Sequence, residues 1–219
     1  PSLATAWADG LLQGWLPGAS ADGIERIKDI DRMLEQVIAQ CPDFEAIISG
    51  WVTDQQQAAG AGRSWLKATK LACLVSGHEY GAEQQLWNLK CSRAEVQTIL
   101  TLLRWVSNLK TQKTLPTEPQ AQFLFFRDVE NAFPAVILMS LALGQNMQVA
   151  TQLIHYFLDT DNPIAHPNPI LSGSDLTKTL GLKPGPIIGQ LLEKLCIAHA
   201  EGKIATSKDA LTYVKSLLP

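Results

Sequence analysis

The sequence predicts an all-α fold of roughly ten helices, arranged as a helical body followed by a small helix-turn-helix tail. Apolar residues recur at every third or fourth position through most of the 219-residue chain. No segment alternates apolar and polar residues over the length of a strand, and no Asn-Gly or Asp-Gly turn joins two β-branched runs. Gly and Pro separate the periodic segments, as is typical of helix ends. Together these observations favour helices alone.

Three helices are expected before residue 62. The opening segment, which Pro17 and Gly18 stop, has an apolar face made of Leu3, Trp7, Leu11, Leu12 and Trp15. A second helix is expected over about 21–39, and a short third helix over 44–52. The inward positions of the second helix are Ile24, Ile27, Ile30, Leu34 and Ile38. Its carboxylates fall on several faces without histidine, which indicates a solvated helix rather than a metal site.

Positive charge concentrates in the middle of the chain. Residues 63–127 contain nine basic and four acidic residues, a net charge of +5, whereas the segments before and after carry −6 and −2. A helix expected over 63–75 places Arg63, Lys67 and Lys70 at i, i+4 and i+7, on one face. This stripe is a candidate surface for RNA phosphates; the alternative is an ordinary solvated face.

The next strong helix begins after Ser92, which forms a capping-box pattern with Glu95. Its apolar face consists of Val96, Ile99, Leu100, Leu103 and Val106. Arg93 and Arg104 are eleven residues apart, nearly three full turns, so they share one side of the helix. We expect Lys90, Arg93 and Arg104 to be weaker candidates for RNA contact.

Three further helices are expected at about 120–131, 134–143 and 147–158. They contain an aromatic-rich set, namely Phe123, Phe125, Phe126, Phe133, Ile154 and Tyr156. Such a set can form a platform for stacked bases, but helical spacing favours core packing. A Pro-rich linker over 160–169 then leads into the tail.

The tail is expected to contain two helices joined by a tight turn, and one final helix. The residues that begin the first helix, end it and begin the second are Ser174, Gly181 and Pro186. The apolar face of the second helix consists of Ile187, Ile188, Leu191, Leu192 and Leu195. Thr206 and Asp209 predict a capping box at the start of the final helix.

The turn between the first two tail helices is the second candidate RNA site. Lys183 and Gly185 lie in the turn, and the amides of Ile187, Ile188 and Gly189 begin the next helix. A cation next to unpaired amides at a helix N-terminus can hold a phosphate. In the alternative interpretation the glycines and prolines only punctuate the chain, Gly189 lets two helices approach, and Lys183 is solvated. The residues alone leave both interpretations open.

Nothing in the sequence forms a recognisable catalytic or metal-binding set. The histidines are isolated, and the four cysteines are scattered without a C-x-x-C pair, which is typical of reduced thiols. The longest apolar run, 133–143, is too short to span a bilayer, and the first residues do not read as a signal peptide. We therefore expect no catalytic residue, metal ligand, cofactor or membrane partner in this chain, and a cytoplasmic location.

The tail also carries an extended motif. In order, it reads G-x-D-L, L-G-x-x-P-G-P-x-I-G-x-L-L, A-x-x-E-G and T-x-x-x-A-L. The positions are Gly173, Asp175, Leu176, Leu180, Gly181, Pro184, Gly185, Pro186, Ile188, Gly189, Leu191, Leu192, Ala198, Glu201, Gly202, Thr206, Ala210 and Leu211. This pattern resembles the tail of bacterial tRNA nucleotidyltransferases, the CCA-adding family and its poly(A) polymerase relatives. LKCSRAEVQTILTLLRW resembles the body of the same family, and AWADGLLQGWLP resembles the end of its neck.

The resemblance implies the C-terminal portion of such an enzyme: the end of the neck helix at 1–20, the body at 21–160 and the tail at 161–219. The family's catalytic head has G-G-x-x-R-D and D-x-D patterns, and Asp159-Thr160-Asp161 spells D-x-D only by accident, within a Pro-rich loop. Mg²⁺ and ATP or CTP are therefore implied for the head and not for this chain.

The implied function is to hold the acceptor arm and elbow of tRNA while nucleotides (CCA, CC, A or poly(A)) are added to its 3′ end. The resemblance is also compatible with a homodimer. The rival class is a non-catalytic helical module that binds a protein partner. Ionic strength distinguishes the two, because binding through phosphates weakens steeply with salt and an apolar protein interface does not.

Overall fold

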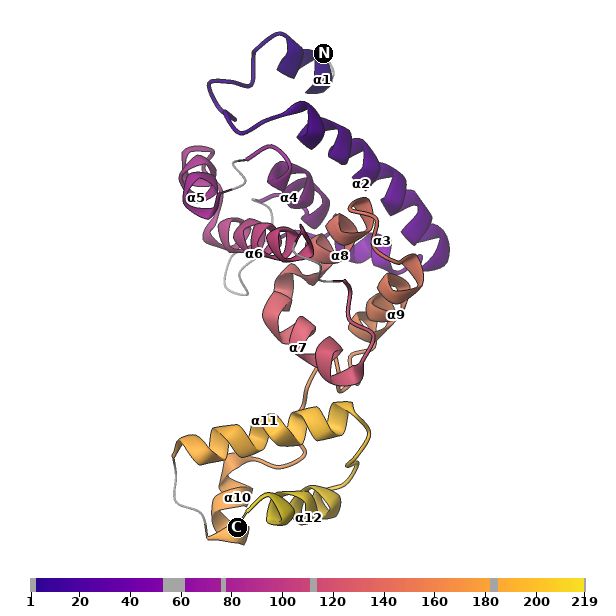
Figure 1. Ribbon diagram of the computed structural model, residues 1–219, viewed down its shortest axis with the longest axis vertical. Helices are drawn as coiled ribbons and strands as arrows, with labels where there is room; N and C mark the ends of the chain where they lie inside the picture. Colours follow the sequence, from indigo (N-terminus) through magenta and orange to yellow (C-terminus); the bar gives the residue numbers. More distant parts are fainter. Residues whose placement is uncertain (1–2, 53–61, 76–77, 111–113, 182–184, 219) are drawn as a thin grey trace. The chain divides into compact units, whose positions relative to one another are not determined.

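The chain is all-α in the computed structural model, which describes residues 3–52, 62–75, 78–110, 114–181 and 185–218 (Figure 1). The elements are α1 Leu3–Ala8, α2 Ala21–Gln40, α3 Phe44–Ser49, α4 Trp65–Ala72, α5 Glu79–Asn88, α6 Arg93–Lys110, α7 Pro119–Val129, η1 Glu130–Ala132, α8 Phe133–Ala142, α9 Met147–Leu158, α10 Gly173–Leu180, α11 Pro186–Ala200 and α12 Ser207–Leu217. Within these ranges, the one β-type pairing is an isolated antiparallel bridge between Trp51 and Ser64. None of the described helices is long and apolar enough to cross a membrane.

The helices form two compact units. The first unit comprises residues 1–115 and 129–154, and the second comprises residues 116–128 and 155–219. The chain therefore leaves the first unit for a short excursion that contains most of α7, returns through η1 and α8, and leaves again within α9.

The first unit is built around α8. This helix is apolar on every side, and each residue from Phe133 to Leu141 is buried, as expected for a helix without a polar face. Helices α2, α3, α4 and α6 pack against it (Figure 1). The longest apolar run in the sequence is thus the centre of a globular core.

Helix α2 confirms its predicted bounds to within a residue. Ser20 caps it by accepting a hydrogen bond from the Gly23 amide at 3.1 Å. Ile24 and Ile30 are buried as predicted; Ile27, Leu34 and Ile38 are half-buried, and Val37 takes the remaining buried position.

The prediction for the opening helix is wrong in length. Helix α1 ends at Ala8, because Gly10 adopts a left-handed conformation with φ 75° and the chain continues in turns to Trp15. Trp7, Leu11 and Trp15 are exposed instead of forming one inward face.

The aromatic-rich set packs as core. Phe123, Phe125 and Phe126 are buried in the second unit, and Phe133 and Ile154 are buried in the first. Tyr156, the sixth predicted member, is half-buried. Core packing is therefore confirmed over a base-stacking platform, because buried rings offer no open face.

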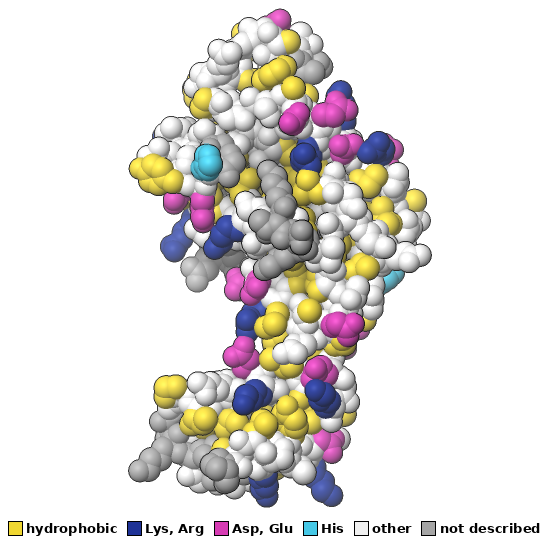
Figure 2. Space-filling view, viewed as in Figure 1, with side chains coloured by type: hydrophobic (Ala, Val, Ile, Leu, Met, Phe, Trp, Pro, Cys, Tyr) yellow, Lys and Arg dark blue, Asp and Glu magenta, His cyan; other side chains and the backbone are white. Residues whose placement is uncertain are grey.

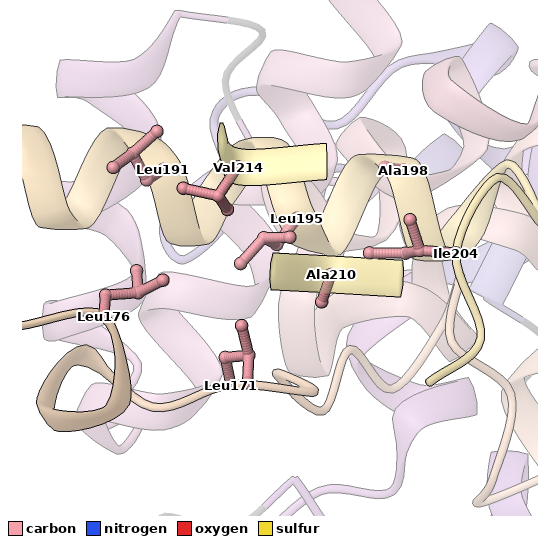
Figure 3. Packing of buried hydrophobic residues seen from close by; sticks show 8 residues of the cluster. All are labelled: Leu171, Leu176, Leu191, Leu195, Ala198, Ile204, Ala210 and Val214. Atoms are coloured by element: carbon pink, nitrogen blue, oxygen red, sulfur yellow. The ribbon is translucent and has the colours of Figure 1, made fainter. Parts of the chain in front are cut away.

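The tail helices α10, α11 and α12 share a small apolar core (Figure 3). Its eight buried members are Leu171, Leu176, Leu191, Leu195, Ala198, Ile204, Ala210 and Val214. Gly181 ends α10 with φ 64°, and Pro186 begins α11, as predicted. The predicted capping box of Thr206 and Asp209 also forms.

The predicted cap of α10 is wrong by two residues. Ser172, not Ser174, is the N-cap, and its hydroxyl accepts from the Asp175 amide at 3.2 Å. The Asp175 carboxylate in turn accepts from the Ser172 amide at 2.8 Å. The acidic residue three positions after Ser172 completes a capping box that no residue provides for Ser174.

Candidate nucleic-acid interface

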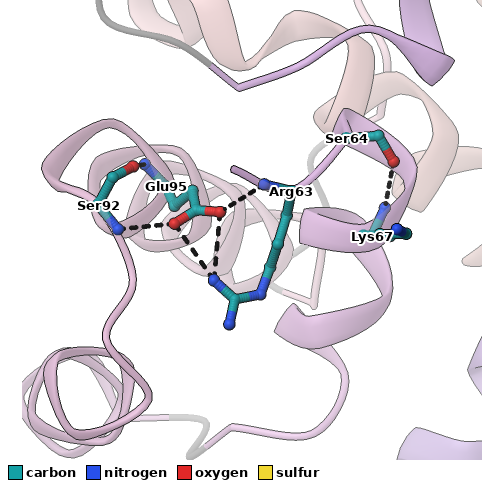
Figure 4. A network of polar contacts seen from close by, with 5 residues as sticks. All are labelled: Arg63, Ser64, Lys67, Ser92 and Glu95. Carbon is teal, nitrogen blue, oxygen red and sulfur yellow. Dashed lines mark hydrogen bonds and ion pairs between the residues drawn. The ribbon is translucent and has the colours of Figure 1, made fainter. Parts of the chain in front are cut away.

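The predicted basic stripe does not lie on one helix face. Helix α4 begins at Trp65, with Ser64 as its N-cap, so Arg63 precedes the helix. The Arg63 Nη1 group donates to both carboxylate oxygens of Glu95, at 3.2 Å each, and the Arg63 amide donates to Glu95 Oε1 at 2.7 Å (Figure 4). The interpretation of Arg63, Lys67 and Lys70 as one helical stripe is therefore wrong, because Arg63 is held by a carboxylate 32 residues away.

Glu95 joins the starts of two helices. It is only 2% exposed, and its Oε2 accepts from the Ser92 amide at 2.6 Å while its own amide donates to Ser92 Oγ at 3.2 Å. The predicted capping box of α6 is confirmed. Because the same carboxylate also binds Arg63, it fixes the N-terminus of α4 beside the N-terminus of α6 (Figure 4).

The two lysines of the predicted stripe have different surroundings. Lys70 forms an ion pair with Asp31 of α2 at 2.5 Å. Lys67 is exposed in the first turn of α4, and its ammonium contacts no carboxylate of the described residues. Of the two, Lys67 is therefore the one whose charge remains available to a ligand.

Lys90 and Arg93 flank the start of α6 and are both exposed. Lys90 has a left-handed backbone with φ 57°, and it ends α5 with a Schellman pair: its amide donates to Trp87 at 3.0 Å, and the next amide donates to Leu86 at 3.1 Å. Arg104, farther along α6, bonds to Thr101 at 3.1 Å and lies 3.8 Å from Glu79. Across the described ranges, neither Lys90 nor Arg93 makes an ion pair.

The structure thus selects three of the six predicted body cations. Lys67, Lys90 and Arg93 are exposed without a carboxylate partner in the described part of the chain, whereas Arg63, Lys70 and Arg104 each have one. The three come from two neighbouring helix N-termini and the end of α5. On the face seen in Figure 2, basic and acidic side chains alternate and do not gather into one broad positive field. On this face, any phosphate surface of the body must therefore be local.

The tail turn differs from the prediction in two ways. Lys183 lies outside the described residues. The Ile188 amide donates to the Gly185 carbonyl at 3.0 Å, so it is not free, contrary to the expectation for Ile187 to Gly189. Ile187 is 44% exposed, which places it outside the apolar face to which the spacing assigned it.

The glycines of the turn line a hollow. A cavity of about 410 Å³ is bounded by Gly173, Ser174, Thr177, Gly185, Ile188 and Gly189. A Cβ on Gly189 would meet nothing within 4 Å, so Gly189 is not needed for a close helix approach. Gly173 is the close contact, because its Cβ would lie 3.2 Å from the Ile188 side chain.

The regions just described lie within the segment of the chain that is similar to a known protein family. The family model described as tRNA nucleotidyltransferase domain 2, putative, matches residues 63–214, which include the α4–α6 junction and most of the tail. The chain belongs to the tRNA nucleotidyltransferase family.

Two curated relatives show how much of such a protein this chain covers. A CC-adding tRNA nucleotidyltransferase of Synechocystis sp. is 32% identical over 217 residues, which are 98% of this chain and 50% of the relative. A CC-adding tRNA nucleotidyltransferase of Thermus thermophilus is 28% identical over 147 residues, 63% of this chain and 32% of the relative. The chain therefore spans at most half the length of these tRNA nucleotidyltransferases.

A third relative matches a shorter segment. An A-adding tRNA nucleotidyltransferase of Deinococcus radiodurans is 41% identical over 51 residues, 23% of this chain and 12% of the relative. No solved structure matches the chain. The names of the relatives thus specify different added nucleotides, and family membership alone does not show which nucleotide would be added.

The described part of this family member offers no cluster of three or more His, Cys, Asp or Glu side chains that could hold a metal. Burial raises the pKa of the Cys73 thiol to about 12, although the nearby Arg26 opposes the shift. Burial also raises the pKa of Cys41, Cys91 and Cys196, so the thiolate form of each is disfavoured at neutral pH. The cysteines are thus suited to packing rather than to nucleophilic chemistry.

Proposed function

We propose that this chain is the C-terminal, tRNA-binding region of a tRNA nucleotidyltransferase and holds tRNA while nucleotides are added to its 3′ end. Family membership and the names of the relatives support the reaction. The observation that carries the binding role is a set of three exposed cations around the α4–α6 junction, Lys67, Lys90 and Arg93, for which no described residue provides a carboxylate partner.

The junction suits a phosphate backbone because it is rigid. Glu95 accepts hydrogen bonds from the Arg63 and Ser92 amides, which precede α4 and α6. The backbone positions that carry the three cations are therefore fixed relative to one another. A fixed cation loses less conformational freedom on binding than one carried on a loop. Exposed ammonium and guanidinium groups then replace the counterions of neighbouring phosphates.

The tail turn is a second contact in this proposal. Gly185, Ile188 and Gly189 line the 410 Å³ hollow. Ile187 lies beside them in the sequence, and Lys183 belongs to the same turn. With the body holding one part of tRNA and the tail another, the acceptor arm and the elbow are the two parts that we assign to them. A homodimer and a cytoplasmic location belong to the proposal as well.

Mg²⁺ and ATP or CTP belong to the reaction that we propose for the whole protein. The described residues do not fit a metal ion, because they contain no group of three or more His, Cys, Asp or Glu side chains that could hold one. We therefore derive no catalytic step from this chain and assign its residues to binding alone.

The test is the salt dependence of tRNA affinity. Replacing Lys67, Lys90 and Arg93 with Ala should flatten the slope of log affinity against log salt by about 2–3, roughly one for each lost phosphate contact. The charge-matched control replaces Lys28, Arg32 and Lys203, each of which pairs with a carboxylate. The control should keep the wild-type slope. An equal loss of slope in both variants would contradict the assignment of these three residues.

A protein-binding module remains the second candidate, because α5 exposes two large aromatic side chains. Tyr80 is 74% exposed and Trp87 is 44% exposed. They are seven residues, or nearly two full turns, apart and so lie on the same side of the helix. If tRNA affinity is weak and independent of salt, while Tyr80→Ala with Trp87→Ala abolishes capture of a protein partner, this function replaces the first.

A further inference from the structure

A cavity of about 190 Å³ lies in the first unit between the start of α4, one face of α6 and η1. Its polar side chains are Gln97, Thr98, Thr101, Glu130 and Asn131, and Trp65 is part of its wall. The volume is below the 300 Å³ or so at which pockets begin to hold a whole drug-sized ligand. The size therefore suits one small planar group better than a complete nucleotide.

Thr98 points to a ligand in this cavity. It is only 6% exposed, yet its hydroxyl makes no hydrogen bond to any described residue. Elsewhere, Thr69 and Ser140 satisfy their hydroxyls by donating to the carbonyl four residues earlier, at 2.8 Å and 2.7 Å. No completely enclosed side-chain oxygen or nitrogen among the described residues lacks a partner, so the Thr98 hydroxyl must open onto the cavity. The partner of this nearly buried hydroxyl therefore comes from outside the chain, as water or as a polar group of a ligand that replaces the water.

Glu130 provides a second, independent observation. It lines the cavity with a backbone φ of 44°, a left-handed conformation that side chains other than Gly rarely adopt. Strained backbone of this kind gathers at ligand sites, where the surrounding structure holds it in place. Glu130 is exposed and is one of the residues that line the cavity, and its side chain ends in a carboxylate, a pure hydrogen-bond acceptor.

We propose that this cavity accepts one unstacked nucleobase that carries an exocyclic amino group, as part of a bound RNA. Glu130 accepts from the amino group, Thr98 bonds to a polar atom on the edge of the base, and Trp65 covers part of its surface. Single-stranded RNA is read in this way, with bases against aromatic side chains and their edges on polar groups. A base without an amino group would present a carbonyl oxygen to the carboxylate, and the two acceptors would repel each other.

The cavity is placed for such a role beside the cations of the proposed interface. Trp65 follows the Ser64 cap of α4, and Ala94, another lining residue, follows Arg93. A strand whose phosphates contact Lys67 and Arg93 therefore has bases within reach of the cavity. The inference rests on the proposed RNA-binding function and adds base selectivity to it.

The experiment compares two strands of equal charge, cytidine pentanucleotide and uridine pentanucleotide, on the complete 219-residue chain. Cytosine has an amino group where uracil has a carbonyl oxygen. We expect the wild type to bind the cytidine strand about 3- to 10-fold more tightly, the range for one well-placed hydrogen bond. Glu130→Gln should bring this ratio close to one, because an amide can donate to the uracil oxygen as well as accept.

Thr98→Val tests the hydroxyl at nearly constant shape. It should weaken binding of the cytidine strand about 3- to 10-fold without lowering Tm, because the hydroxyl has no internal partner to lose. Thr212→Val, in α12 of the second unit, is the matched control and should leave affinity unchanged. Equal affinities of the wild type for the two strands, or a preference that survives both Glu130→Gln and Thr98→Val, would overturn the inference. If both strands bind equally but with a steep salt dependence, only this inference fails; if neither binds, the proposed RNA-binding function fails with it.

Discussion

Removal of the Glu95 carboxylate should destabilise the first unit far more than the loss of an ordinary surface ion pair. The carboxylate accepts from the Arg63 amide at 2.7 Å, the Ser92 amide at 2.6 Å and the Arg63 guanidinium, and it is 2% exposed. In Glu95→Ala the Arg63 guanidinium loses its carboxylate partner, which costs about 1 kcal/mol for a group that is one-third exposed. Two backbone donors also lose their acceptor, at about 1 kcal/mol each for partly solvated groups.

The expected loss is therefore about 3 kcal/mol, at the lower end of the cost of breaking a buried ion pair. It should appear as a fall in Tm of about 6–12 °C for a chain of this size. Unfolding of the protein in guanidinium chloride, followed by circular dichroism, measures the free energy of unfolding. Arg63→Ala should cost less, because its backbone amide remains and the guanidinium is already 33% exposed.

The matched control is Glu25→Ala, which removes the partner of Lys28 in an ion pair where both side chains are about two-thirds exposed. That pair should contribute about 0.5 kcal/mol or less. If Glu95→Ala costs no more than Glu25→Ala, the carboxylate does not hold the two helix starts together. The argument for a rigid α4–α6 junction would then be wrong.

Four further outcomes are expected. Lys90→Gly should raise the free energy of unfolding by about 0.5–1 kcal/mol, because φ 57° suits Gly, while it weakens tRNA binding. In thermal melts, Gly181→Ala should lose about 1 kcal/mol at φ 64°, whereas Gly185→Ala should lose little, because φ 166° is ordinary extended backbone with open space beside it. Hydrogen bonds from Ser172 and Thr206 lower the pKa of the Asp175 and Asp209 carboxyls. The stabilisation that these two carboxylates provide is therefore present above the unfolded-state pKa near 4 and is lost as pH falls through the folded-state pKa. Replacing both residues with Asn should lower Tm at pH 7 and flatten the decline of Tm below pH 4. Incubation of the chain with tRNA and labelled CTP or ATP should give no incorporation, and any incorporation would contradict the assignment of its residues to binding alone.

The elements that could be predicted from the sequence are those whose signals are local. The capping boxes at Ser92 and Thr206, the left-handed Gly181 and the Pro186 start each depend on residues within one helical turn. The same holds for the bounds of α2. In the tail these signals place the end of α10 and the starts of α11 and α12. The cap of α10 is an exception, because its signal, Ser172 with Asp175, is local and was nevertheless assigned to Ser174.

Long-range contacts set the features that the sequence did not predict. Gly23 is an example: a Cβ at this position would lie 2.1 Å from the Cys73 carbonyl oxygen, so α2 can approach the end of α4 only with Gly there. Nothing near Gly23 in the sequence indicates this, because its neighbour in space is 50 residues away. Gly173 likewise faces Ile188, whereas the sequence suggested Gly189 as the residue of close approach.

In the candidate interface, too, local spacing predicted which cations are present, and long-range contacts determine which of them are neutralised. Helical spacing grouped Arg63, Lys67 and Lys70, but spacing carries no information about which cation has a carboxylate partner. Asp31 and Glu95, brought in from other helices, neutralise two of the three. Lys90 and Arg93 looked weaker, since no stripe connected them. Both are exposed, and neither pairs with a carboxylate in the described part of the chain, so tertiary structure and not periodicity determines which cations remain available to a phosphate.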